Sequence, residues 1–170
     1  MNSKTIYKIL KSDEAVSPTF YGVFPSDRLP DKINGGRCSV VANVDTSAGP
    51  GSHWVAFYID QEGLCVYFDS YGRPPCLESF TAFIKRNSSQ EIHNQKHLQG
   101  PFSSTCGQYS VYFLAHICRG YSLRDIVKAF DEQEDNDEAV TEFVNTRFDV
   151  NTETFNADFI LDQISSAFEK

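Results

Sequence analysis

The sequence predicts an α+β fold. Strand-like apolar runs gather between residues 38 and 70, whereas helix-like runs occupy both ends of the chain. Hydrophobic residues make up 41% and aromatic residues 14% of the 170 residues, a content that supports one sizeable core. No internal repeat or linker divides the chain. We therefore expect a single domain over residues 1–170.

The first half of the chain predicts one helix and three strands. Residues 4–11 have the pattern of a short helix. Prolines and glycines interrupt residues 18–37, so we expect an irregular segment there. The run CSVVANV over 38–44 indicates a buried strand. The runs HWVAFYID (53–60) and LCVYFDS (64–70) are separated by a short turn that contains glycine, and they predict a hairpin.

The middle of the chain leads into an apolar helix. Residues 77–87 have apolar side chains at helical spacing. Residues 88–99 favour a loop that leads into a strand. The stretch CGQYSVYFLAHIC, 106–118, is apolar on nearly all sides, which is typical of a helix buried at the centre of a domain.

The last third predicts further helices around an acidic run. Residues 122–130 form a candidate helix with Ser122 as its N-cap. The run DEQEDNDE, 131–138, indicates a solvated acidic loop or helix face. Helices are expected near 138–147 and 153–168.

Charge and cysteine content exclude several classes of protein. The formal net charge is -8, which argues against a protein that coats nucleic acid by charge alone. The N-terminal residues lack an apolar signal core, and no run approaches the ~18 apolar residues of a membrane helix. The five cysteines are odd in number and form no CxxC pair, so we expect free thiols in a reducing compartment, no metal site and no cofactor.

Three groups suggest thiol chemistry. Cys106 lies where a loop of small residues enters the apolar helix, and a helix N-terminus lowers the pKa of a thiol. His53 opens the first hairpin strand and Asp69 closes the second, so a hairpin brings them to the same edge of the sheet. Such a pair supplies a base and its orienting acid. The Gln99 amide could share stabilisation of an oxyanion with the Cys106 N–H.

These residues resemble the active-site signature of adenovirus-type cysteine endopeptidases (adenain). The stretch QGPFSSTCG, 99–107, matches the family's Gln seven residues before the nucleophilic Cys. The His53-Trp54 pair and Asp69 follow the family's order His, acid, Gln, Cys, which SUMO-specific proteases share. The resemblance implies a papain-like fold in which a central sheet packs against a buried helix that starts at the nucleophile.

The resemblance also implies the role of each residue. His53, Asp69 and Cys106 would form the catalytic triad, and Gln99 would belong to the oxyanion hole. Further candidates for the substrate cleft follow from their neighbourhood in sequence: Gly51, Ser52, Trp54 and Gly107.

The function implied is a thiol endopeptidase that cuts beside Gly or another small residue and matures viral capsid precursors. Relatives of this kind occur in virophages and Polinton/Maverick elements, and they match the size of this chain. We expect a monomer that acts on polypeptides inside the host cell, with packaging into the virion as a further expectation.

Two departures from the adenovirus enzymes bear on partners. Those enzymes bind an activating peptide through a disulfide to a cysteine, where this chain has Ser88, so any activating peptide here would not be linked in that way. They are also basic and use DNA as a cofactor, which the acidic composition of this chain does not favour.

Two alternative functions would use the same residues, and a third is disfavoured. A protease specific for ubiquitin-like proteins would have the same triad and a large docking surface. An acetyltransferase would use Cys106, His53 and Asp69 with a small acyl donor. A binding module is disfavoured because all four of His53, Asp69, Gln99 and Cys106 are present.

Overall fold

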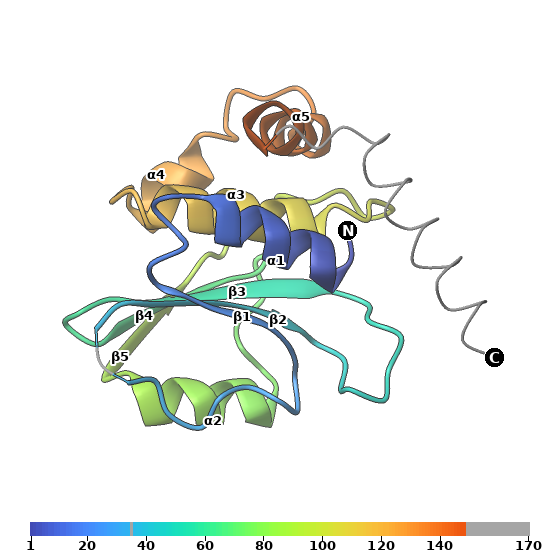
Figure 1. The fold of residues 1–170 in the computed structure, drawn as a ribbon. Coiled ribbons are helices and arrows are strands. Elements are labelled where there is room, and N and C mark those ends of the chain that lie inside the picture. Colours follow the sequence, from blue (N-terminus) through green and yellow to red (C-terminus); the bar gives the residue numbers. More distant parts are fainter. Residues whose placement is uncertain (35, 149–170) are drawn as a thin grey trace.

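A five-stranded sheet forms the centre of the computed structural model, which describes residues 1–34 and 36–148 (Figure 1). The strands lie side by side in chain order. They are β1 (Phe20–Pro25), β2 (Cys38–Asn43), β3 (Trp54–Ile59), β4 (Leu64–Phe68) and β5 (Gln90–His93). The middle three strands are antiparallel, and each outer strand runs parallel to its neighbour. The predicted α+β class is confirmed.

Helices cover both faces of the sheet (Figure 1). They are α1 (Ser3–Ser12), α2 (Glu78–Asn87), α3 (Cys106–Ile117), α4 (Leu123–Lys128) and α5 (Asn136–Phe148). Helices α1 and α3 lie on one face, with α5 stacked behind α3, and α2 lies on the other face. The sheet is therefore the middle layer of the molecule.

Alternation along β4 divides its side chains between two core clusters. Val66 and Phe68 join the cluster on the α3 side, and Cys65 and Tyr67 join the cluster on the α2 side. The Phe68 ring stacks on Phe113 of α3, with centroids 4.7 Å apart. This contact fixes α3 against the hairpin that precedes Asp69.

Helix α3 is buried along most of its length, which confirms the prediction of a central helix. The side chains of Tyr109, Val111, Phe113 and Leu114 are all 0% exposed. Its burial between the sheet and α5 holds its first residue, Cys106, beside Trp54 at the start of β3, the middle strand of the sheet.

Two predictions in the loop regions are wrong in detail. The segment 18–37 is not irregular throughout, because residues Phe20–Pro25 pair with β2 as an edge strand whose register shifts between Phe20 and Gly22. In 88–99 the strand comes first and the loop follows. In both segments, strand formation depends on pairing with a neighbouring strand, which a local sequence pattern does not reveal. The helix expected over 153–168 lies outside the described residues.

Candidate active site

The β3–β4 hairpin brings His53 and Asp69 together. His53 immediately precedes β3, and Asp69 immediately follows β4. The Nε2 atom of His53 lies 2.7 Å from Oδ1 of Asp69, and the two residues are only 9% and 3% exposed. The pair is therefore shielded from water, in a setting that strengthens the attraction between a carboxylate and an imidazolium.

Asp69 is itself held by its neighbours in space. The backbone N–H of Tyr71 donates to Asp69 Oδ1 at 2.8 Å. Buried Asn94 accepts from the Asp69 N–H at 3.0 Å and donates to its carbonyl at 2.6 Å. Sequence reasoning missed Asn94, because it lies on a loop 25 residues away and no motif marks it.

An aromatic ring covers His53. The Tyr71 ring stacks on the imidazole, with centroids 4.9 Å apart and planes 26° from parallel. The Arg73 guanidinium lies over Tyr71, 4.9 Å from the ring centroid. Tyr71 was also missed; only its position two residues after Asp69 could have suggested it. The stack limits rotation of the imidazole about its side-chain bonds.

Cys106 is the first residue of α3 and is in contact with His53. Burial alone would raise the pKa of the Cys106 thiol, but the hydrogen bond with His53 and the backbone N–H groups of Trp54 and Gly107 bring it below its ordinary value. Burial opposes the positive charge of His53, yet Asp69 and Cys106 together raise the pKa of His53 to about 9. The geometry thus favours a thiolate beside an imidazolium.

The two nitrogens of His53 have different partners. Asp69 occupies Nε2, so Nδ1 is the nitrogen that remains for the thiol. Because the Asp69 carboxylate binds Nε2, Nδ1 is the nitrogen that can take up or release a proton. The side chain is thus arranged to pass a proton between Cys106 and a bound molecule.

Gln99 is oriented at both ends of its amide. Its Oε1 accepts from the Ser70 hydroxyl at 2.7 Å, and its Nε2 donates to the Ser103 carbonyl at 2.8 Å. The side chain is 2% exposed and lines the same cleft as Cys106. Since an amide nitrogen carries two protons, one N–H remains for a bound group. Ser70, which fixes this orientation, was missed at the sequence level.

The four residues share one cleft with a volume of about 630 Å³. Gly51, Ser52 and Trp54 also line this cleft. Gly107 is buried and is not among the lining residues, and an added Cβ there would lie 2.9 Å from the Met1 side chain. Trp54 has three contacts: it lines the cleft, it packs against the core, and its Nε1 donates to the Met1 carbonyl at 3.0 Å.

The described residues contain no group of three or more His, Cys, Asp or Glu side chains that could hold a metal ion. All five cysteines are free thiols. Within residues 1–34 and 36–148, no helix has the length and apolar character needed to cross a membrane.

The turn after Asp69 depends on a glycine. Gly72 has φ +69°, and an added Cβ would lie 2.7 Å from the Gln95 carbonyl oxygen, which is backbone and cannot move aside. We expect Gly72→Ala to lower the free energy of unfolding by about 3 kcal/mol. Gly120→Ala is the matched control, because Gly120 has φ +90° but open space around it. Urea unfolding of both variants would test this, and equal losses would contradict the role of the close contact.

The charge states of the pair predict how reactivity depends on pH. The rate of Cys106 alkylation by iodoacetamide should rise with pH as the thiol ionises, and this rise should occur below the ordinary thiol pKa of 9.0. The rate should stay high above pH 9. Peptide hydrolysis should instead fall as the pH rises through about 9, because His53 then loses the proton that a leaving amine requires. Parallel profiles of the two reactions would contradict this assignment.

Two viral proteins are similar in sequence to this chain. No family model matches the chain. The R355 protein of Acanthamoeba polyphaga mimivirus, named as a thiol protease, is 34% identical over 112 residues, which cover 59% of this chain and 36% of that protein. The cysteine protease S273R of African swine fever virus is 33% identical over 88 residues, which cover 44% of this chain and 31% of that protein. The chain therefore matches only about a third of the length of these curated relatives.

One solved structure supports the fold alone. The central domain of the uncharacterized Lpg1148 protein from Legionella pneumophila superposes with a TM-score of 0.51 and 14% identity, over 87% of this chain and 95% of that one. In sequence, the chain is similar to two viral proteins that are both named as cysteine or thiol proteases.

Proposed function

We propose that this chain is a cysteine endopeptidase with a papain-like arrangement of the active site. The observation that carries the proposal is the buried His53–Asp69 pair, 2.7 Å apart, set against Cys106 at the start of a buried helix. The names of the two viral relatives support it. The chain order His, Asp, Gln, Cys is the order of adenain and SUMO-specific proteases.

The proposed reaction is acyl transfer through the thiol. The Cys106 thiolate attacks the scissile carbonyl carbon, and the resulting oxyanion accepts hydrogen bonds from the Cys106 N–H and the Gln99 amide. The imidazolium of His53 gives its proton to the leaving amine as the C–N bond breaks. Water, deprotonated by His53, then attacks the thioester, and the C–S bond breaks to release the acid and the thiol.

The proposed substrates are polypeptides with Gly or another small residue beside the cut bond, such as viral capsid precursors. Support comes from the resemblance to adenain and from the viral origin of both relatives. Four small residues, Gly51, Ser52, Ser103 and Ser104, are also among those that line the cleft.

A panel of substrates tests the proposal. The purified chain would be incubated with a peptidyl-Gly-Gly-aminomethylcoumarin, with capsid precursors and with ubiquitin-like fusions that end in Gly-Gly. Release of coumarin and cleavage of the precursors would support it, and cleavage of the fusions alone would favour a protease for ubiquitin-like proteins. Transfer of acetyl from acetyl-CoA without any peptide cleavage would overturn it.

A further inference from the structure

Asp137, at the end of the acidic run expected to be solvated, instead binds the loop before the nucleophile. It lies in the first turn of α5 and is half-buried. The Gly100 N–H donates to its Oδ2 at 2.9 Å, and the Thr105 hydroxyl donates to its Oδ1 at 2.5 Å. Gly100 follows Gln99, and Thr105 precedes Cys106. One carboxylate thus joins the two ends of the loop that connects the two oxyanion donors.

The interior of this loop transmits that constraint to Gln99. The Ser103 carbonyl accepts the bond from Gln99 Nε2. The Ser103 hydroxyl lies 2.6 Å from the Thr105 hydroxyl and accepts from the Thr105 N–H at 3.2 Å. The direction of the Gln99 amide therefore depends on Ser103, which Thr105 holds and Asp137 anchors.

Residues of both segments allow the first turn of α5 to lie close to the loop before Cys106. A Cβ on Gly100 would lie 2.7 Å from Asp137 Oδ2, so glycine is what lets the carboxylate reach the main chain. Next to Asp137, the Asn136 amide donates to the Leu98 carbonyl at 3.1 Å. The first turn of α5 therefore contacts the chain immediately before and after Gln99.

We propose that Asp137 is a positioning residue that sets the distance between the Gln99 amide and the Cys106 N–H. This rests on the proposed use of those two groups as oxyanion donors. A carboxylate suits the task because each of its oxygens accepts one of the two bonds, whereas an asparagine has only one acceptor oxygen. Asp137 acts through the loop and does not line the cleft.

Two reactions of the same thiol separate this role from a general structural one. Iodoacetamide alkylates Cys106 by displacement of iodide, with no oxyanion. In acetylation by p-nitrophenyl acetate, the thiolate adds to the carbonyl, a tetrahedral oxyanion forms, and p-nitrophenolate leaves. Asp137→Asn should slow acetylation roughly 10-fold to 100-fold. Alkylation should stay within about twofold of wild type, because the contact of Cys106 with His53 is intact.

Two further variants complete the test. Glu138→Gln makes the same change of charge on the next residue, which is exposed, and should alter neither reaction. Thr105→Val removes one of the two bonds and should slow acetylation selectively, as Asp137→Asn does. Unchanged acetylation in Asp137→Asn, or an equal loss in both reactions, would overturn the proposal. Neither reagent is a peptide, so both reactions can be measured even if the wild-type chain cleaves no peptide. Absence of peptide cleavage would count against the proposed function. The effect of Asp137→Asn on the two reactions would still test the role of Asp137.

Discussion

Removal of Cys106, of His53 or of both is expected to reduce peptide hydrolysis to nearly the same residual level. Each alanine variant should lose roughly 10⁴-fold in kcat/KM, and the double variant should lose no more. The reason is that the thiolate and the imidazolium act as one unit. Without Cys106 there is no nucleophile for His53 to serve, and without His53 the thiol loses both its proton acceptor and the hydrogen bond that lowers its pKa. Hydrolysis of a peptidyl-Gly-Gly-aminomethylcoumarin measures all three variants.

A histidine away from the cleft provides the control. His93 lies on β5 and does not line the cleft, so His93→Ala should retain activity within about twofold. Multiplicative losses in the double variant would show that the two residues act independently, and would contradict the pair. Full activity in His53→Ala would remove His53 from the mechanism.

The part of the site that the sequence predicts comes from two local patterns. The hairpin predicted over residues 53–70 places His53, at the start of one strand, beside Asp69, at the end of the next. The change from small residues to a long apolar run places Cys106 at a helix start. Both patterns work because strand pairing across a hairpin and the first residue of a helix are set within a few residues.

The supporting contacts of the site could not be predicted in the same way. Asn94 meets Asp69 across 25 residues, and Asp137 meets Thr105 across 32. The acidic run looked like a solvated face because charge is the local signal, and only the packing of α5 on α3 brings Asp137 to the loop. Gly107 is the opposite case: its place in the motif suggested that it lines the cleft, but it lies on the buried face of α3.

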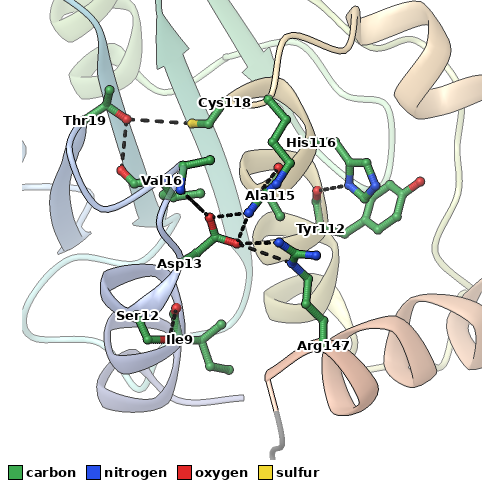
Figure 2. Close-up of polar contacts among 12 residues, drawn as sticks. Ile9, Ser12, Asp13, Val16, Thr19, Tyr112, Ala115, His116, Cys118 and Arg147 are labelled. Carbon is green, nitrogen blue, oxygen red and sulfur yellow. Dashed lines mark hydrogen bonds and ion pairs between the residues drawn. The ribbon is translucent and has the colours of Figure 1, made fainter.

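A second group of long-range contacts ties the far end of α3 to the rest of the fold (Figure 2). Asp13, directly after α1, is 4% exposed. One terminal nitrogen of Arg119 donates to both of its carboxylate oxygens at 2.8 and 2.9 Å, and Arg147 of α5 lies 3.4 Å from Oδ2. Backbone N–H groups of Ala15 and Val16 also donate to Oδ1. One carboxylate therefore links α1, the end of α3 and α5.

Asp13→Ala is expected to lower the free energy of unfolding by about 3 kcal/mol. The variant leaves two backbone N–H groups and two partly buried guanidinium groups without their acceptor, although the arginines keep some contact with water, at 28% and 39% side-chain exposure. Urea unfolding measures the loss. Glu14→Ala is the matched control, because Glu14 is the exposed neighbour and should change stability by no more than about 0.5 kcal/mol.

The loss should depend on pH in a direction that identifies its cause. Burial alone would raise the pKa of the Asp13 carboxyl, but Arg119 and the N–H groups of Ala15 and Val16 hold it below its ordinary value of 3.8. A lowered pKa in the folded state means that the ionised group stabilises the fold above pH 3.8 and that this contribution is lost as the pH falls through the folded-state pKa. The difference between wild type and Asp13→Ala should therefore be largest near neutral pH and should shrink below pH 3.8. A constant difference over this range would show that Asp13 stabilises the fold by packing and neutral hydrogen bonds, without its charge.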